Sequence, residues 1–533
     1  MELVKKNIQT DRIKAKTLFQ LPIEEDINVS DTRPDVGKLV FYRGKVKIDE
    51  IKTAMNKVWV KGKLVYQVLY TAEGKESGLA GMEGELPFME EIYMESVEGQ
   101  DRVVCTADLE DMRVNMINSR KLNIQAVIAL KPCAEEIATQ EVCVQLNKEN
   151  TLQQGTRQMQ GAVPEQLEYR KKILEYLETI VCKRDLFRIH EDHKLPAAVP
   201  AIGKILWKSA DINHVKFKPM GEKINVSGEI SIFIMYTDDN QEKTNWYEGK
   251  VPFSGEVECQ GCNENMVADI SYEVGHEEIT IREDGDGESR LIGIEMTLEL
   301  EIKLLSRDST QIVSDVYGVT CEVEAMTEPK QFKSLYQDVD TEEKISGIMK
   351  LEDTEPKILQ ICHSDAKVEV DECDITGSEA VIKGNLQLRM LYIAADDNEY
   401  YMAQQSQPFD IRRQIQGVKN TVQYTLHAQI EQLNISIKEG NQAQWDVVLD
   451  IKLLIYDVEQ EDILTEIKIS ELDSSKIEKL PGFAIYFVRE GDTLWQIGRK
   501  YYVSVDKIKE INQLTSDEIK AGDKLLIVKS GEV

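Results

Sequence analysis

The stretch "VKGKLVYQVLYT", residues 60–71, recurs as "VSGEISIFIMYT" at 226–237 and as "IKGNLQLRMLYI" at 382–393. Each copy has glycine at its third place and tyrosine at its eleventh, namely Gly62, Gly228 and Gly384, and Tyr70, Tyr236 and Tyr392. The copies lie 166 and then 156 residues apart. Because this spacing is domain-sized, the sequence predicts three tandem domains rather than a short-period solenoid.

Two further landmarks keep a nearly constant distance from each glycine. A proline stands 28 residues before it, at Pro34, Pro200 and Pro356, and a Pro-Phe pair follows it, ending at Phe88, Phe253 and Phe409. A glycine inside a strand marks a bulge or a close backbone approach. The tyrosine closes a strand whose alternate residues would face a core. We therefore interpret the landmarks as fold residues without chemistry.

Each unit ends in a predicted hairpin, in which alternating apolar residues flank a turn of Gly, Asn, Asp or Ser. The acidic turn at 284–287 lacks the twelfth-position glutamate of a calcium loop, so we interpret it as a hairpin turn. The predicted fold class is mainly β. It consists of three tandem antiparallel β domains, sandwich-like or barrel-like, followed by a small α+β (βααβ) module.

The predicted domain organisation has six parts. They are a first repeat at 1–150, a linker with a helix or strand at 151–190, a second repeat at 191–335, a third repeat at 336–472, a linker at 473–483, and the tail module at 484–530. Leu167, Ile173, Leu174 and Leu177 approximate helical spacing, so helix and strand both stay open for that segment.

Composition narrows the class of partner. The formal net charge of −31 argues against nucleic acid and against anionic lipid, since both need a basic surface. No stretch approaches the roughly 20 apolar residues of a membrane span, and the start "MELVKKNIQTDRIK" lacks the apolar core of a secretory signal. We therefore expect the chain in the cytosol of the cell that makes it.

The nine cysteines are odd in number and have no framework spacing, as is typical of a reducing compartment. Cys259 and Cys262 form the only C-x-x-C motif, which supplies two of the four ligands of a structural zinc. We expect no metal site and no cofactor.

The tail reads as strand, helix, helix, strand. "AIYFV" at 484–488 and "KLLIV" at 524–528 are short β runs. Thr493 with Gln496 forms a capping-box pattern for a first helix, and Ser504 can cap a second.

This module resembles the LysM family through "YFVREGDTLWQIGRKY", then "IKEINQL", then "IKAGDKLLI". The resemblance implies binding of N-acetylglucosamine polymers, peptidoglycan or chitin, in a shallow groove between two loops. The positions that match the groove are Gly491, Asp492, Thr493 and Leu494 on one side, and Asn512, Leu514, Asp517, Glu518 and Ile519 on the other. Several of these residues also serve the module's own fold, so both roles stay open.

The three repeats resemble the SPOCS domain of spore-coat proteins, through the proline, glycine and tyrosine landmarks. Three such repeats and one C-terminal LysM domain are similar to the SipL-type family of clostridial spore-coat morphogenetic proteins. The resemblance implies a scaffold at the forespore surface in the mother-cell cytoplasm and in the spore coat. Its implied partner is a coat-morphogenetic ATPase of the stage IV sporulation protein A type.

Three functions stay open at this point. The first is a non-enzymatic adaptor in coat assembly, with LysM as a protein-recognition module. The second is a peptidoglycan-binding protein acting through LysM. The third is a LysM-tethered cell-wall enzyme, which we disfavour because the sequence has no HExxH, G-x-S-x-G or P-loop motif and its six histidines share no repeat position. We therefore predict no catalytic residue.

Overall fold

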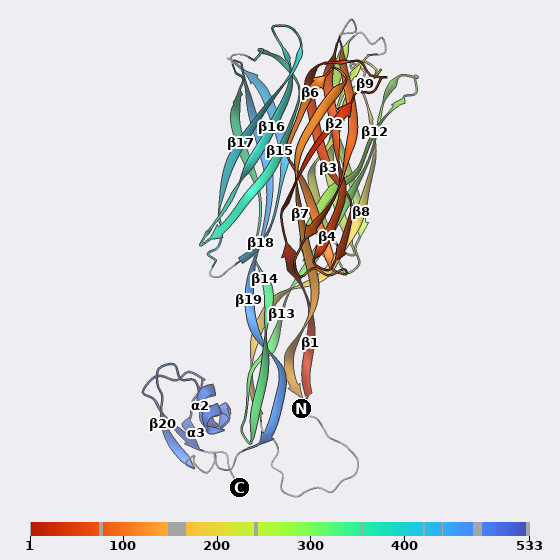
Figure 1. Ribbon diagram of the computed structural model, residues 1–533. Helices are drawn as coiled ribbons and strands as arrows, with labels where there is room; N and C mark the ends of the chain where they lie inside the picture. Colours follow the sequence, from red (N-terminus) through yellow and green to blue (C-terminus); the bar gives the residue numbers. More distant parts are fainter. Residues whose placement is uncertain are drawn as a thin grey trace.

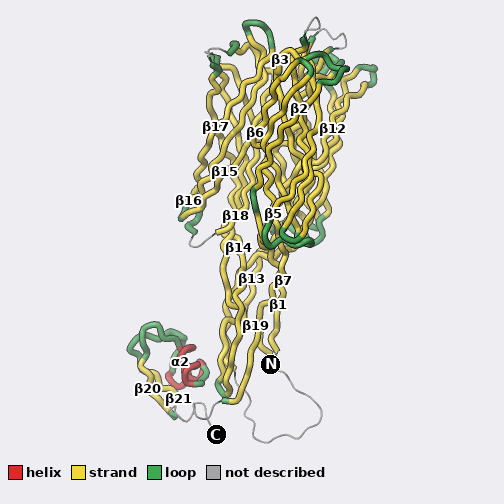
Figure 2. The backbone as a smooth tube through the Cα atoms, viewed as in Figure 1, coloured by secondary structure: helices red, strands yellow, loops and turns green. Residues whose placement is uncertain are grey.

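The computed structural model describes residues 2–73, 78–147, 167–238, 243–352, 355–418, 422–439, 441–472 and 482–528. Long antiparallel strands build a broad head that narrows into a stalk, and the tail module lies beside the far end of the stalk (Figure 1). The two helices of the described chain belong to the tail module (Figure 2).

The elements repeat in order. The first repeat contains β1 (Glu2–Lys16), β2 (Phe19–Asn28), β3 (Val36–Ala54), β4 (Lys57–Ala72), β5 (Leu79–Tyr93), β6 (Arg102–Asn118) and β7 (Lys121–Asn147). The second contains β8 (Leu167–Lys194), β9 (Ile205–Met220), β10 (Lys223–Thr237), β11 (Thr244–Glu258), β12 (Val267–Glu283) and β13 (Ser289–Gly318). The third contains β14 (Cys321–Lys350), β15 (Ile358–Thr376), β16 (Glu379–Ala394), β17 (Tyr400–Gln414), β18 (Val422–Lys438) and β19 (Gln442–Glu471). The tail contains β20 (Phe483–Phe487), α2 (Leu494–Tyr501), α3 (Val505–Asn512) and β21 (Lys524–Val528).

Each repeat is a sandwich of two antiparallel sheets. One sheet has the order β3-β4-β5, and the other joins β6 to β7, which pairs with β1 and β2 along its length. The second and third repeats copy this plan with β9-β10-β11 over β12-β13-β8, and β15-β16-β17 over β18-β19-β14. One apolar core fills each sandwich. The predicted mainly β fold is confirmed.

The segment that begins at Leu167 is a strand rather than a helix. It forms β8, which pairs with β13 from Leu167 to Lys194 and so lies in the sheet of the second repeat. Likewise β14 runs through the predicted boundary at 335/336 as one strand paired with β19. Residues 151–166 of the predicted linker at 151–190, and 473–481 of the predicted linker at 473–483, lie outside the described residues.

The repeated glycine makes room for the repeated phenylalanine. Gly62 pairs directly with Phe88 across β4 and β5, and a Cβ at Gly62 would lie 2.7 Å from the Phe88 ring and 2.4 Å from the carbonyl oxygen of Lys47. Gly228 and Gly384 face their phenylalanines in the same register. The close approach predicted from the glycines is therefore a contact with the aromatic ring of the neighbouring strand, which occupies the space that a Cβ would need.

The repeated tyrosine ties the end of its strand to the repeated proline. The Tyr70 hydroxyl donates to the carbonyl of Pro34 at 3.1 Å. The same bond joins Tyr236 to Pro200 at 2.8 Å and Tyr392 to Pro356 at 3.4 Å. The three tyrosine rings are fully buried, so each bond satisfies a buried hydroxyl and fixes the loop that leads into the sandwich.

The three sandwiches surround a common axis. Phe41, Trp207 and His363 are related by the same 166- and 156-residue offsets as the glycines, and the Phe41 ring packs edge to face against both of the other rings. Val40, Leu206 and Cys362, adjacent in sequence to these three, join the same apolar cluster. One residue set thus supplies a shared core between repeats that are far apart in the sequence.

The stalk continues the long strands of all three repeats as three two-stranded ribbons, β1 with β7, β8 with β13, and β14 with β19 (Figure 1). Its centre is apolar and is filled by Ile8, Val142, Leu174, Tyr176, Ile312, Phe332 and Ile463. Where the stalk meets the head, Asp11 from the first repeat lies 2.5 Å from Lys333 of the third and 3.3 Å from Lys303 of the second. All three side chains are almost fully buried.

Cys259 and Cys262 are core residues of a loop between β11 and β12. Both are buried, at 0% and 3% exposure. Met94 and Val97 hold the corresponding places in the first repeat and are buried there as well. The pair therefore acts as two small apolar side chains in the sandwich core.

Candidate recognition sites in the tail module and the head

The tail module folds around its own core, with Val488, Leu494, Ile497, Val503 and Ile508 among its buried residues. The predicted capping box is present: the Thr493 hydroxyl accepts from the Gln496 amide, and the Gln496 side chain accepts from the Thr493 amide, both at 3.2 Å. The Ser504 hydroxyl caps α3 by accepting from the Lys507 amide at 3.2 Å. These caps define where each helix begins and so shape the loops beside them.

On the first predicted side of the groove, some residues are accessible to a ligand and others are held by contacts within the module. Gly491 is exposed and has a φ of +86°, which suits glycine at this turn. The Asp492 carboxylate accepts from the Tyr486 hydroxyl and the Arg489 amide, each at 2.8 Å, and these bonds lower its pKa. Leu494 is 2% exposed and belongs to the core. Asp492 and Leu494 therefore hold the loop in shape.

The second predicted side is divided in the same manner. The Asn512 side chain bonds the carbonyls of Ile508 and Leu526 and the Leu526 amide, so it joins α3 to β21. Leu514 and Ile519 pack partly buried against the module's core.

The two acidic residues of this side point to solvent. Asp517 is exposed and pairs with Lys509 at 2.7 Å, and Glu518 is exposed as well. Among the nine predicted residues, Gly491, Asp517 and Glu518 are those that a ligand could reach without disturbing the fold. The others position the two loops on one core.

The sequence analysis did not identify an apolar face on the two-stranded sheet of the tail module, which is formed by β20 and β21. Phe483, Ile485 and Phe487 alternate along β20 and are 72%, 61% and 58% exposed, and Leu526 lies opposite Ile485 on β21. We call these four residues the hairpin face. The period-two pattern of large apolar residues in a short strand was the available signal, but alternation alone does not tell a core face from an open one.

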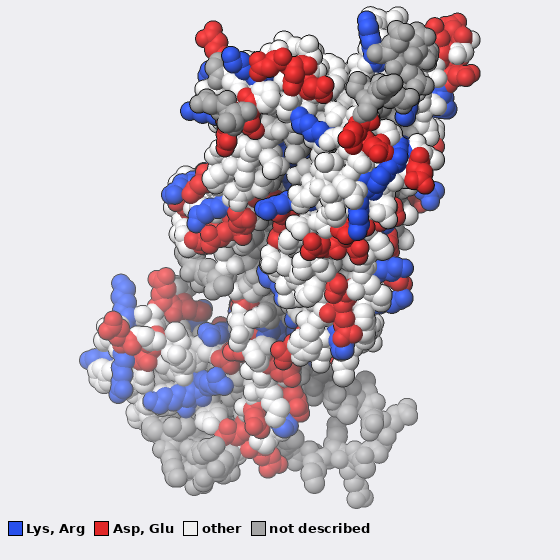
Figure 3. Space-filling view, turned by 45° about the horizontal axis from the view of Figure 1, so that its top comes forward, with Lys and Arg blue, Asp and Glu red and all other residues white. Residues whose placement is uncertain are grey.

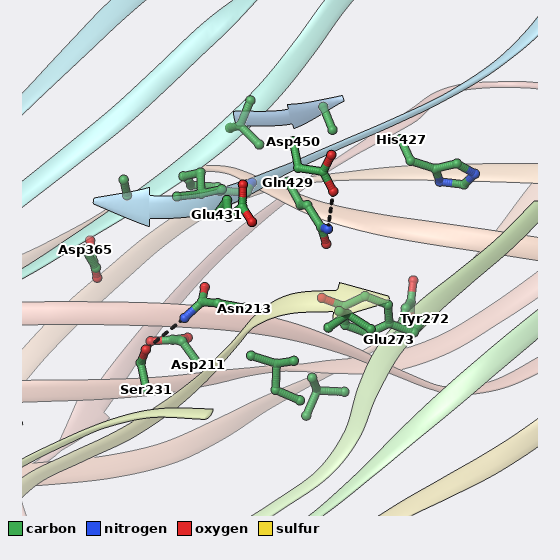
Figure 4. Close-up of a pocket in the computed structure, with 18 of the residues that line it drawn as sticks. Asp211, Asn213, Ser231, Tyr272, Glu273, Asp365, His427, Gln429, Glu431 and Asp450 are labelled. Atoms are coloured by element: carbon green, nitrogen blue, oxygen red, sulfur yellow. Dashed lines mark hydrogen bonds between the residues drawn. The ribbon is translucent and has the colours of Figure 1, made fainter. Parts of the chain in front are cut away.

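The head contains a second candidate site, a cavity between the three repeats that is partly open to solvent. This cavity of about 2330 Å³ is lined mainly by β3, β6, β9, β12, β15 and β18, which are edge strands of the six sheets, and neighbouring strands complete the lining. Polar residues of all three repeats line it. Figure 4 shows two hydrogen-bonded pairs among them, Asn213–Ser231 of the second repeat and Gln429–Asp450 of the third. Partial desolvation and the carboxylates of Glu299 and Asp108 raise the pKa of Glu273 to about 7, although its side chain faces the cavity rather than the protein core.

Several charged residues around this cavity form ion pairs between repeats. His214 lies 2.8 Å from Glu431, and His427 lies 2.9 Å from Asp269, so both histidines join the second repeat to the third. Arg43 pairs with Asp211 between the first and second repeats. Within the described residues, no group of three His, Cys, Asp or Glu side chains could hold a metal ion. These ion pairs hold the sandwiches together.

Comparison with protein-family models gives matches for the three repeats and for the tail module. The model described as "SipL, SPOCS domain" matches residues 35–117, 201–282 and 357–438, and the LysM domain model matches 486–528. Each SPOCS match covers four strands. In the first repeat these are β3, β4 and β5, which form one sheet, and β6, which is the first strand of the last hairpin.

One curated protein shares a short segment with this chain. It is the "Cell wall-binding protein YocH" of Bacillus subtilis, 55% identical over 40 residues, which are 8% of this chain and 14% of that protein. No solved structure matches the chain. In the described residues, no helix is long and apolar enough to cross a membrane.

Proposed function

We propose that this chain, which has the SipL-type architecture of three SPOCS domains followed by one LysM domain, is a non-enzymatic adaptor of endospore coat assembly. In this role it binds the coat-morphogenetic ATPase, of the stage IV sporulation protein A type, at the forespore surface in the mother-cell cytoplasm. SPOCS and LysM domains are binding modules rather than catalytic ones. Tandem domains raise effective concentration at a polymer surface without a tight individual site.

The hairpin face is the observation that carries the choice of a protein partner for LysM. Three large apolar side chains of β20 are more than half exposed and lie on one side of a strand. Such a contiguous apolar patch is typical of a protein interface, whereas a glycan groove needs polar donors beside smaller apolar surfaces.

Charge supports the same reading. Residues 476–533 contain ten Lys and Arg and nine Asp and Glu, a charge of +1, so the remaining chain carries −32. Lys and Arg are spread over the LysM module, while Asp and Glu gather along the stalk (Figure 3). An acidic partner therefore meets less repulsion at the module than elsewhere on the molecule.

Peptidoglycan binding is the second candidate function. The LysM match covers the whole module, and the curated relative is named as a cell wall-binding protein. In this reading the ligand occupies the groove near Gly491, Asp517 and Glu518, and the hairpin face has no role.

The test uses full-length protein and two matched variants of the module. Ile485→Asp alters the hairpin face at a 61% exposed position, and Asp517→Lys with Glu518→Lys alters the groove. Ile497→Asp, which places a charge in the core, is the control for a misfolded module. Each variant is used to pull down partners from sporulating cells and to pellet with purified peptidoglycan.

We expect Ile485→Asp to lose the ATPase while it keeps any pelleting. Loss of pelleting in the groove variant together with retained ATPase binding by Ile485→Asp would favour the peptidoglycan function. If a chain that ends near Leu480 binds the ATPase as well as the full chain, the three SPOCS repeats carry that contact instead.

A further inference from the structure

The LysM module contacts the far end of the stalk through one face of α2. The Trp495 indole N–H donates to the carboxylate of Asp315 at 2.8 Å. Arg499, one helical turn later, lies 3.2 Å from both oxygens of the same carboxylate. Since Asp315 belongs to β13, one stalk side chain holds two side chains of the module.

Tyr317 provides the apolar part of this contact. Its ring packs edge to face against Trp495, with centroids 4.7 Å apart and planes at 75°. Its hydroxyl donates to the carbonyl of Val503 at 2.9 Å in a buried hydrogen bond, and the residue is only 3% exposed. A buried tyrosine at the tip of a stalk, bonded to another module, indicates a fitted surface rather than a passing contact.

The glycine of α2 fits the same surface. A Cβ at Gly498 would lie 2.6 Å from the Tyr317 hydroxyl, and 2.6 Å from the Val503 carbonyl of its own module. Two further pairs widen the contact: the Arg170 guanidinium lies 5.5 Å from the Trp495 ring, and the Tyr502 hydroxyl donates to Glu322 at 3.0 Å.

We propose that the stalk tip is a cradle for the LysM module of the same chain, formed by Arg170, Asp315, Tyr317 and Glu322. The cradle residues come from β8, β13 and β14, so the second and third repeats build it together. The module is thereby held in one orientation against the stalk. This inference is independent of which partner LysM binds.

The cradle divides the module's surface into a covered and an open part. Trp495, Arg499 and Tyr502 face the stalk, whereas Gly491, Asp517 and Glu518 of the groove are exposed. The hairpin face is exposed too. A macromolecule that binds the docked module uses the groove or the hairpin face, and one that needs Trp495 has to displace the stalk.

The test reverses the central charge pair in the full-length chain. Asp315→Arg and Arg499→Asp each replace attraction by repulsion, and the double variant restores a pair of opposite charges. The control is Glu518→Ala, an exposed change in the same module. Amide hydrogen exchange at 315–318 and 502–504 reports contact, and small-angle X-ray scattering reports whether the module stays beside the stalk.

We expect each single variant to speed exchange at both segments by about tenfold and to broaden the scattering envelope. The double variant should recover most of the protection, and Glu518→Ala should match the parent. Unchanged exchange in both single variants would overturn the cradle, as would a double variant as unprotected as the singles. Protection that falls on dilution of the parent chain would place the module of a second copy in the cradle, which also contradicts the proposal.

Discussion

Phe41 and Trp207 occupy corresponding positions of the first and second repeats, and their rings meet edge to face with centroids 5.2 Å apart. His363 holds the same position in the third repeat and stacks on Phe233 at 3.9 Å. The repeats are therefore one body with a shared aromatic centre, not three domains on a string. Because the repeats share this centre, a destabilising substitution in one sandwich should also lower the stability of the other two.

The seat of the Phe88 ring should not tolerate a methyl group at Gly62. A Cβ there meets the backbone oxygen of Lys47 at 2.4 Å, and backbone cannot rotate away as a side chain can. We expect Gly62→Ala to lower the free energy of unfolding by about 2–3 kcal/mol, measured by urea denaturation.

Gly285→Ala is the matched control, because a Cβ at that exposed turn meets no atom within 4 Å. It should change the free energy of unfolding by less than about 0.5 kcal/mol. Equal effects of the two substitutions would mean that the glycine is not required for packing.

The bonds from tyrosine to proline should differ in strength among the repeats. Tyr236→Phe removes the shortest of the three bonds, 2.8 Å to Pro200, and leaves a carbonyl without its donor. We expect a loss of about 1 kcal/mol in the urea unfolding of this variant, and a smaller loss for Tyr392→Phe, whose bond is 3.4 Å. A larger loss in the third repeat than in the second would contradict this order.

The carboxylate of Asp11 should make stability depend on acid. Burial alone would raise the pKa of Asp11, but Lys333 and Lys303 outweigh burial and hold it below 3.8. A lowered folded-state pKa gives stability that is present above the unfolded pKa and is lost as pH falls through the folded pKa. At pH 7, Asp11→Asn leaves two buried ammonium groups without their shared partner and should cost about 3 kcal/mol.

This cost should begin to shrink as the pH falls below about 4, where Asp11 of the unfolded parent chain becomes protonated, and it should be lost once the pH falls through the lower pKa of the folded state. Thermal unfolding from pH 3 to pH 7 measures the difference between the two chains. Asp111→Asn is the control, since Asp111 is 53% exposed and pairs only with Arg113 on the surface in the described chain. A pH-independent effect of Asp11→Asn would show that the charge itself is unimportant.

The buried thiols should accept apolar substitutes better than polar ones. Val97 occupies the place of Cys262 in the first repeat, so Cys262→Val should leave stability within about 1 kcal/mol of the parent. Cys262→Ser buries a hydroxyl and should cost about 1–2 kcal/mol more than Cys262→Val. Zinc analysis of the purified parent should give no stoichiometric metal. A stoichiometric zinc that Cys262→Val removes would refute this reading.

The sequence predicted those parts of the structure that repeat or follow a local code. The Gly62 series indicated a close backbone approach, and Thr493 and Ser504 indicated the two helix starts, because caps and glycine contacts depend on few neighbours. The hydrogen bonds from tyrosine to proline were not predicted. The available signal was the constant separation of 36 residues between each proline and its tyrosine.

The joining of the three sandwiches could not be predicted. Phe41, Trp207 and His363 share a position but not a residue type, so no repeated pattern pointed to the axis. Asp315 and Trp495 are 180 residues apart, and only the folded stalk brings them together. Two of the residues predicted for the groove, Leu494 and Asn512, instead stabilise the fold of the module. The sequence could not show this, because the same residue type can serve in a core or in a ligand contact.

The buried ions at the base of the head give the repeats an identity that their common fold does not. The positions that correspond to Asp11 hold Leu177 in the second repeat and Lys333 in the third. A molecule built from three copies of the first repeat would bring three aspartates to the axis, and one built from three copies of the third would bring three lysines. In neither molecule would this position supply both members of an ion pair, so the pairing of Asp11 with Lys333 depends on repeats that are not identical in sequence.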